Sequence, residues 1–228
     1  ETVFLSFWFI LFYLVLPIKT RHRFAAFWCN TVLIWLRIAC NIRYTVEGLE
    51  NLELHKSLEE RNDNKAPFVI LCNHQSSWET IFLYKLIYPV SPILKKELLR
   101  IPFWGWAMAL QKPIALDRSK PREAGRYLMR KGAERLAEGY SLVIFPEGTR
   151  AAPGELKRFS KGGSKLAVDT NTAVLPIVHN AGHFWPRGII KHPGTVSVKI
   201  GSPISAEGKT SEQLTSEVEE WMKANLPD

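Results

Sequence analysis

The stretch APFVILCNHQSSWETIFLYKLI, residues 66–87, contains the unit that decides the fold of this chain. Its first seven residues form a compact apolar run, which is typical of a buried β-strand. The segment SSWETIFLYKLI (76–87) predicts a helix. Because sites in α/β folds lie in the loops that follow strands, the polar connection NHQSS (73–77) is a candidate functional loop.

The same alternation of strands and helices continues along the chain. Further strands are predicted at 42–48, 91–96, 112–117, 141–145, 172–178 and 195–200. Helices are predicted at 97–110 (whole, or broken around Pro102 and Gly105), 121–139 (Pro121 first, Gly139 last) and 210–226. The last helix starts with a TxxQ capping box, Thr210 and Gln213. The polar stretch 55–65 is expected to be a surface loop or short helix. The pattern predicts an α/β fold with a mixed, largely parallel central sheet flanked by helices.

The composition limits the classes of protein. With 228 residues, of which 46% are hydrophobic and 23% charged, the chain can fold as one globular domain with an appendage. The formal net charge of +8 favours anionic partners, and the eight tryptophans favour a lipid surface over nucleic acid. Three cysteines without CxxC spacing argue against a disulfide framework and against a thiolate zinc site.

The first forty residues predict a membrane-associated helical pair, residues 1–40, ahead of an α/β domain at 41–228. An uncharged apolar run (3–18), the basic cluster KTRHR (19–23) and a second apolar run (24–40) follow one another. A secretory signal is disfavoured, because no basic segment precedes the run and no small-residue cleavage site follows it. A buried core helix is the alternative. Asn30 and Arg37 favour an interfacial second helix, so we expect attachment at the cytoplasmic face, which is the inner membrane if the source is bacterial.

The loop NHQSSWE permits two interpretations. Ser76 and Glu79 form an SxxE capping box, with Ser76 as N-cap and Glu79 at N3, which explains the glutamate structurally. The same geometry places a carboxylate beside His74. A carboxylate there would fix the imidazole tautomer and leave the other ring nitrogen as a general base.

Two basic regions are candidate phosphate sites. FPEGTR (145–150) follows a predicted strand, and Arg150 offers a planar fork of donors suited to phosphate. In RFSKGGSK (158–165), Lys161 precedes paired glycines, but the spacing of a nucleotide P-loop is absent. In KKELLRIPFWGWAMALQKPIALDR (95–118), basic ends that include Lys95 and Arg118 flank an aromatic, apolar middle. This pattern suits a phosphorylated molecule with a fatty tail, or alternatively a core helix with solvated ends.

Other chemistries are less well supported. Cys72 lies within an apolar strand, which favours an inert thiol over a nucleophile. His179 and His183 have metal-ligand spacing, but Gly182 lies between them and HExxH is absent. No GxSxG motif occurs. The stripe of arginines at 122, 126 and 130 is more simply a solvated helix face than a nucleic-acid site. No metal, no cofactor and no nucleic-acid partner are therefore expected.

NHQSSWE, the KKEL…IPFWGW…LDR stretch, FPEGTR and VLPI (174–177) occur in the order and spacing of the glycerolipid acyltransferases. The chain resembles the PlsC-type family of 1-acyl-glycerol-3-phosphate (lysophosphatidate) acyltransferases over roughly residues 40–205. NH-x4-acid and FPEGTR together are a highly specific combination. The N-terminal apolar segments also resemble the membrane anchor of such enzymes.

The resemblance implies a role for individual residues. His74 would deprotonate the free glycerol hydroxyl, and Glu79 stands where the family usually has Asp, one methylene shorter. Pro176 matches a position associated with acceptor or acyl-chain binding. The residues that resemble the family's glycerol-phosphate contacts are Arg118, Glu147, Gly148, Thr149 and Arg150.

The implied reaction is transfer of an acyl chain from acyl-CoA or acyl carrier protein to the sn-2 hydroxyl of lysophosphatidate, which gives phosphatidate. Acyl-CoA or acyl carrier protein would be a co-substrate, and the membrane partners would be lysophosphatidate and an anionic phospholipid surface. Another lysophospholipid or glycerol phosphate could replace the acceptor. A catalytically silent protein that binds anionic lipid is the alternative of a different class.

Overall fold

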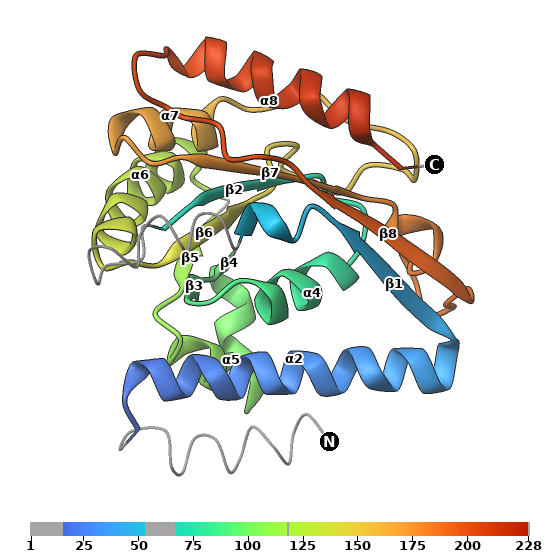
Figure 1. The fold of residues 1–228 in the computed structure, drawn as a ribbon. Coiled ribbons are helices and arrows are strands. Elements are labelled where there is room, and N and C mark those ends of the chain that lie inside the picture. The colour runs from blue at the N-terminus through green and yellow to red at the C-terminus, as the bar shows by residue number, and fades with distance from the viewer. Residues whose placement is uncertain (1–15, 53–66, 118, 228) are drawn as a thin grey trace.

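The computed structural model describes residues 16–52, 67–117 and 119–227 (Figure 1). A six-stranded sheet lies at its centre, in the order β1-β8-β7-β2-β6-β3, and only the β7–β8 pair is antiparallel. The strands are β1 (Ile42–Glu47), β2 (Val69–Cys72), β3 (Val90–Ser91), β6 (Ser141–Ile144), β7 (Val174–His179) and β8 (Gly194–Ile200). A separate parallel pair consists of β4 (Ile93–Lys95) and β5 (Ile114–Leu116). The predicted mixed, largely parallel sheet is confirmed.

Helices cover both faces of the sheet. One face is covered by α4 (Trp78–Leu86), with α2 (Ile18–Cys40) outside it, and the other by α6 (Pro121–Ala137), α7 (Gly162–Asp169) and α8 (Ser211–Asn225) (Figure 1). Successive side chains of β2 alternate between the two cores: Ile70 packs on the α4 side, and Leu71 on the α7 side. Because both faces are buried, the strand appears in the sequence as a continuous apolar run.

The helix boundaries follow the local signals in most places. The Thr210–Gln213 capping box is present in both directions. Pro121 is the first residue of α6, and Gly139, two residues past its end, has φ +83°. The predicted helix at 97–110 is broken, into the 3-10 helix η2 (Lys96–Arg100) and α5 (Trp104–Ala109), with Phe103 between them at φ +62°.

The helix α7 was not predicted, because its GGSK start has weak helix propensity. Tertiary packing explains it. A Cβ added to Gly163 would lie 2.6 Å from Cδ2 of Leu71, so the glycine lets α7 approach β2 closely. The strand predicted at 91–96 is limited to Ile93–Lys95, because Ser91 belongs to β3 in the main sheet.

The helix α2 includes the basic cluster at 19–23 and is long and apolar enough, by length and composition, to cross a membrane. Its exposed large apolar residues occupy one stripe within about 100° of the helix circumference: Phe24, Phe27, Ile34, Trp35 and Ile38. The opposite side packs through Leu33 into the core. The first apolar run lies almost entirely in residues 1–15, and the polar stretch 55–65 also falls outside the described residues.

Candidate active site

Three parallel strands end at the same edge of the sheet and bring three loops together. The strands β2, β6 and β7 are neighbours, with β2 in the middle. Asn73 and His74 follow β2, the FPEGTR segment follows β6, and His179 is the last residue of β7. Ala151 N–H donates to the carbonyl of His74 at 2.7 Å, which joins the first two loops.

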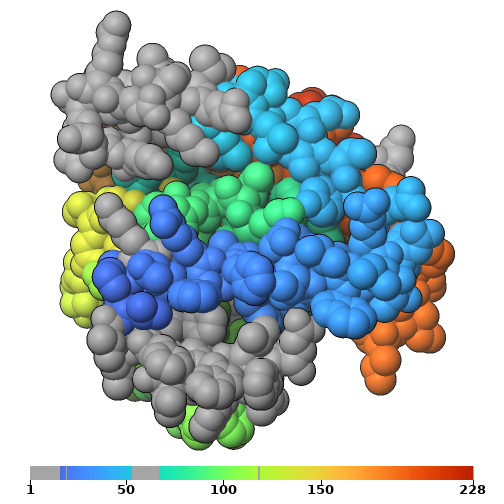
Figure 2. Space-filling view, turned by 60° about the horizontal axis from the view of Figure 1, so that its bottom comes forward, coloured from blue at the N-terminus to red at the C-terminus, as the bar shows by residue number. Residues whose placement is uncertain are grey.

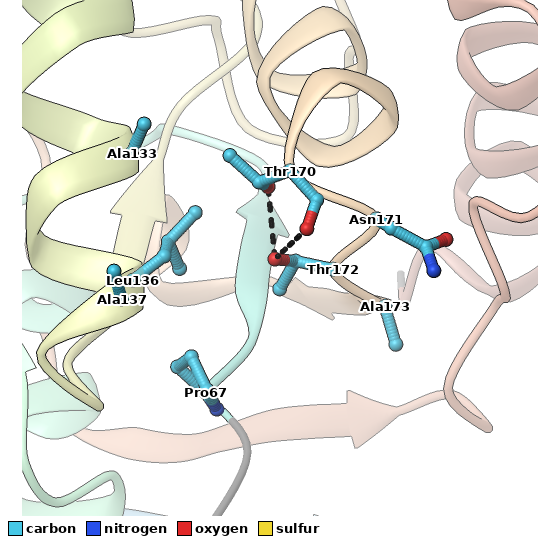
Figure 3. A pocket seen from close by; sticks show the side chains of 8 residues that line it. All are labelled: Pro67, Ala133, Leu136, Ala137, Thr170, Asn171, Thr172 and Ala173. Carbon is cyan, nitrogen blue, oxygen red and sulfur yellow. Dashed lines mark hydrogen bonds between the residues drawn. The ribbon is translucent and has the colours of Figure 1, made fainter.

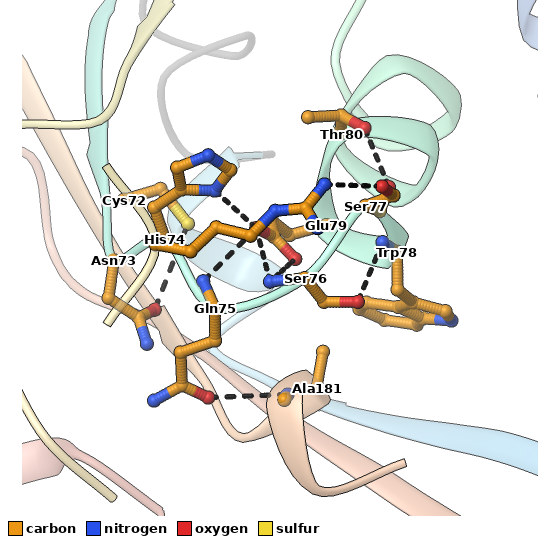
Figure 4. A network of polar contacts seen from close by, with 12 residues as sticks. Cys72, Asn73, His74, Gln75, Ser76, Ser77, Trp78, Glu79, Thr80 and Ala181 are labelled. Carbon is orange, nitrogen blue, oxygen red and sulfur yellow. Dashed lines mark hydrogen bonds and ion pairs between the residues drawn. The ribbon is translucent and has the colours of Figure 1, made fainter. Parts of the chain in front are cut away.

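His74 and Glu79 are in direct contact. Nδ1 of His74 lies 2.7 Å from Oε1 of Glu79, whose carboxylate is fully buried (Figure 4). The same oxygen accepts the backbone N–H groups of Gln75 and Ser76, at 3.2 and 2.9 Å. Because this oxygen is an acceptor in the whole network, Nδ1 is the donor and carries the ring hydrogen.

The other side of the His74 ring is available for chemistry. The ring stacks on Phe145, with centroids 4.3 Å apart, and the side chain is 19% exposed. With Nδ1 protonated, Nε2 of the neutral imidazole carries a lone pair. The pair therefore has the geometry of a general base that is oriented by a carboxylate.

The capping box predicted at Ser76 and Glu79 is wrong in register. Helix α4 begins at Trp78 with Ser77 as N-cap, so Glu79 is the second helical residue. The Ser76 hydroxyl accepts from Trp78 N–H at 3.1 Å, not from Glu79. The Glu79 carboxylate does accept the N–H of Ser76, as the box predicts. One glutamate thus both caps the loop and holds the imidazole.

A second buried histidine, His179, adjoins this network, although in the sequence it was considered only as a candidate metal ligand. Nε2 of His179 lies 3.1 Å from the carbonyl of Asn73, and its Nδ1 accepts from Ala181 N–H at 3.1 Å. Burial lowers the pKa of His179 below its usual value, against the charge of Glu79, whose Oε2 is 3.8 Å away. His179 is therefore neutral, with its hydrogen on Nε2.

Glu147 binds main chain. Its Oε1 accepts the N–H of His74 at 2.8 Å and its Oε2 accepts the N–H of Lys157 at 3.0 Å. The side chain is buried, and burial raises the pKa of Glu147 while these two N–H groups oppose the rise. Both oxygens are occupied, which suits a brace between two loops better than a contact with substrate.

Three cations lie together at the same edge. The guanidinium of Arg150 donates to the Ser77 hydroxyl. The main-chain carbonyl of Arg150 accepts from Lys157 Nζ at 2.8 Å and from Arg187 Nη2 at 3.0 Å. Within the described part of the chain, none of the three forms an ion pair with a carboxylate. Arg150 belongs to the FPEGTR segment identified in the sequence, whereas Arg187 comes from a third loop and was not identified there.

Gly148 and Thr149 lie in an exposed turn between Glu147 and Arg150, and Gly148 has φ +70°. Arg118 lies outside the described residues. Lys95 is exposed at the end of β4.

Two predicted substrate contacts face elements other than the His74 loop. Lys161 pairs with Glu212 at the start of α8, at 2.8 Å. Pro176 is buried in β7, and Gly201 N–H donates to its carbonyl at 2.9 Å. A Cβ added to that glycine would lie within 3 Å of both Pro176 and Trp221, so the proline side packs toward α8.

A surface pocket lies at another part of the molecule. Its volume is about 510 Å³, and it lies between α6, the turn after α7 and the start of β2 (Figure 3). It is lined by Thr170, Thr172, Pro67 and Leu136 among others, at the edge of the sheet opposite His74.

Burial raises the pKa of the Cys72 thiol well above its usual value, which disfavours a thiolate nucleophile.

Comparison with known proteins agrees with this geometry. The acyltransferase family model matches residues 43–180. The chain is 43% identical over 219 residues to the 1-acyl-sn-glycerol-3-phosphate acyltransferase of Pseudomonas aeruginosa. The aligned region covers 94% of this chain and 81% of that protein. The corresponding protein of Saccharomyces cerevisiae is 34% identical over 165 residues, 70% of this chain and 54% of its own length.

A solved structure is also similar. The crystal structure of the 1-acyl-sn-glycerophosphate (LPA) acyltransferase PlsC from Thermotoga maritima matches with a TM-score of 0.74 at 25% identity, over 98% of this chain and 92% of that one. The matched family region includes His74, Glu79, Glu147 and Arg150. By sequence and by fold, the chain belongs to the acyltransferase family.

Proposed function

We propose that the protein transfers a fatty acyl chain from an acyl thioester, acyl-CoA or acyl carrier protein, to the sn-2 hydroxyl of lysophosphatidate. The single observation that carries the proposal is the 2.7 Å contact between Nδ1 of His74, whose side chain is 19% exposed, and the buried Glu79. The names of the bacterial and yeast relatives, both 1-acyl-sn-glycerol-3-phosphate acyltransferases, support lysophosphatidate as acceptor.

The proton follows a short path in this scheme. Nε2 of His74 takes the proton of the acceptor hydroxyl as its oxygen attacks the thioester carbonyl carbon. The carbon–oxygen bond forms, the carbon–sulfur bond breaks, and the leaving thiolate takes the proton back from Nε2. Glu79 stabilises the transient imidazolium through Nδ1, and a positioned general base of this kind contributes typically 10²–10⁴-fold to rate. Phe145 and Glu79 together fix the ring plane.

The acceptor phosphate would lie at the cation cluster. Arg150, Lys157 and Arg187 are close to one another and to the His74 loop, through contacts of 2.7 to 3.0 Å between their backbones and side chains. A guanidinium without a carboxylate partner suits a phosphate dianion. In this assignment Glu147 acts as a positioning residue, and Gly148 and Thr149 shape the turn that presents Arg150. Lys95, Lys161, Arg118 and Pro176 stay predictions from the sequence.

The enzyme would work at the cytoplasmic face of a membrane. The exposed apolar stripe of α2 and its flanking Arg23 and Arg37 support a helix that lies in the interface. The apolar run at 3–18 would add a further anchor. A lipid acceptor and an anionic phospholipid surface are then the natural partners.

Acyl transfer measured with purified full-length protein in liposomes tests the proposal. Wild type is offered a panel of acyl-CoA and acyl carrier protein donors and of lysophosphatidate, other lysophospholipids and glycerol phosphate. His74→Ala should lose about 10²–10⁴-fold in kcat. His183→Ala, an exposed histidine outside the network, is the matched control. Absence of transfer by wild type, or full activity of His74→Ala, contradicts the proposal and leaves a silent lipid-binding protein.

The phosphate assignment has its own test. Arg150→Ala should raise the acceptor KM by about 10-fold or more, since a charge-assisted hydrogen bond contributes roughly 1.5–3 kcal/mol. Its effect on the donor KM should be small. Arg158→Ala removes an exposed arginine of the same basic segment as a control. An unchanged acceptor KM in Arg150→Ala would place the phosphate elsewhere.

A further inference from the structure

The loop between the 3-10 helix η3 (Ala181–His183) and β8 carries two consecutive isoleucines at its tip. Ile189 is 95% exposed and Ile190 is 72% exposed, more than any other large hydrophobic side chain among the described residues. An isolated exposed apolar residue needs no explanation. Two adjacent ones, held at a loop tip, indicate a surface that meets something apolar.

The loop is braced, so its exposure is built into the fold. Lys191 Nζ donates to the carbonyls of Gly188 and Ile189, at 3.2 and 2.9 Å, and lies over the Trp185 ring, 4.7 Å from its centroid. His192 N–H donates to the Phe184 carbonyl at 2.8 Å and closes the base of the loop. These contacts hold two carbonyls of the tip in place while the side chains of Ile189 and Ile190 are exposed.

The charges around the tip favour an anionic surface. Arg187 and Lys191 stand on either side of the isoleucines, and across residues 16–52, 67–117 and 119–227 neither forms an ion pair with a carboxylate. An apolar tip flanked by cations matches the boundary between acyl chains and anionic headgroups.

The position of the loop connects it with both α2 and the site. Gly194 N–H, where the loop returns, donates to the carbonyl of Asn41 at the C-terminal end of α2, at 3.1 Å. Figure 2 shows the orange segment beside that end of α2, on the same face of the molecule. At its other end, the Trp185 carbonyl accepts from the Ser76 hydroxyl at 2.7 Å, and Arg187 reaches Arg150.

We propose that residues 187–191 form a second membrane contact, in which Ile189 and Ile190 enter the leaflet of an anionic phospholipid membrane. The loop then holds the His74 edge of the sheet against the surface from which a lipid acceptor comes. This inference rests on the proposed acyl transfer to a lipid. It goes further in assigning a membrane role to a segment outside the N-terminal helices.

Depth-dependent quenching tests the contact directly. An environment-sensitive fluorophore is placed at Ile189→Cys in full-length Cys40→Ser protein, because Cys29 and Cys72 are buried. The control label is at Glu220→Cys on α8, which covers the sheet face away from α2 (Figure 1). The protein is reconstituted in vesicles of phosphatidylcholine with phosphatidylglycerol. We expect nitroxide-labelled lipid to quench position 189 several-fold more than 220, and aqueous iodide to do the reverse.

Two results of that experiment would overturn the proposal. Quenching of 189 by iodide to the same degree as 220, without quenching by the lipid nitroxide, would show that the tip is in water. Protection of 189 from both quenchers, with cross-linking between labelled copies, would show that a second copy of the chain covers it.

The activity of Ile189→Ser/Ile190→Ser gives an independent readout. We expect the apparent KM for lysophosphatidate embedded in vesicles to rise several-fold, and kcat/KM for a dispersed short-chain acceptor to stay at the wild-type value. Leu49→Ser, at an exposed turn after β1, is the matched control. Equal losses on both acceptors, or none, contradict the proposal. If wild type acylates neither acceptor, the proposed function fails, and the quenching result still decides the membrane contact.

Discussion

The two buried carboxylates of the site hold the same residue in different ways. Glu79 contacts the ring of His74, and Glu147 accepts its backbone N–H. Glu79 is five positions from His74 in the sequence, whereas Glu147 is 73 positions away and comes from the loop after β6. The comparison indicates that the position of one imidazole depends on two separate contacts. The contact with Glu79 orients the ring, and the contact with Glu147 positions the main chain of His74.

We expect the largest effect on kcat when the charge of Glu79 is removed. In Glu79→Gln, an amide NH₂ group would face N–H groups that now donate to the carboxylate, and the imidazolium of His74 would lose its counter-charge. We expect kcat to fall by about 10²–10⁴-fold with little change in either KM. Steady-state kinetics on protein of verified thermal stability measures the effect.

Glu79→Asp is the conservative control for that change. It retains the charge and has the residue type that the resemblance implies at this position, so kcat should stay within about 10-fold of wild type, which is roughly 1.4 kcal/mol. If Glu79→Gln retained wild-type kcat, Glu79 would be only a helix cap.

Glu147→Gln should have a smaller effect, because the contact between His74 and Glu79 remains. One of the two N–H donors would then face an amide NH₂, and an unsatisfied buried group costs about 1–3 kcal/mol. We expect a lower unfolding temperature and about a 10-fold fall in kcat. Glu155→Gln, at an exposed position of the same segment, is the control. A loss of kcat as large as that of Glu79→Gln would mean that Glu147 takes part in the chemistry.

The smallest expected effect concerns pH and His179. Burial lowers the pKa of His179 in the folded protein below 6.5, so below pH 6.5 the unfolded chain binds a proton that the folded chain does not. The free energy of unfolding contributed by this residue is therefore fully present above pH 6.5 and decreases as the pH falls below it. Thermal unfolding on both sides of pH 6.5 measures this slope.

His179→Gln should reduce that slope, because glutamine does not titrate. His192→Gln, at an exposed histidine between η3 and β8, should leave it unchanged. An equally steep acid loss of stability in His179→Gln would assign the slope to other groups. Kinetics of the same variant indicate whether the buried histidine also affects the His74–Glu79 contact.

Much of the fold could be predicted because it depends on local patterns. Apolar runs identified β2, β6 and β7, since both faces of the central strands are buried. Caps and Pro121 identified α6 and α8. The start of α4 was wrong by one residue, because Ser76 and Ser77 are equivalent as cap residues in sequence, and the Ser76 hydroxyl is used by Trp185 and Trp78.

The site was predicted where its partners are near in sequence and where the resemblance supplied the rest. Lys161 illustrates what the sequence does not specify: its ammonium pairs with Glu212, 51 positions away, and its role toward a phosphate stays a prediction. Lys157 was singled out only as part of a basic segment and Arg187 not at all, and only the tertiary structure brings both to Arg150.

By itself, the sequence determined the strand–loop–helix unit at 66–87, the carboxylate beside His74 and the apolar, basic character of the N-terminal segment. These follow from periodicity, from the reach of a side chain over five residues and from composition. The tertiary structure alone decided that Glu147 braces His74, that Gly163 permits a helix and that Ile189 and Ile190 face outward. Such contacts depend on the order of strands in the sheet, and no local energy of the chain specifies which distant loops that order brings together.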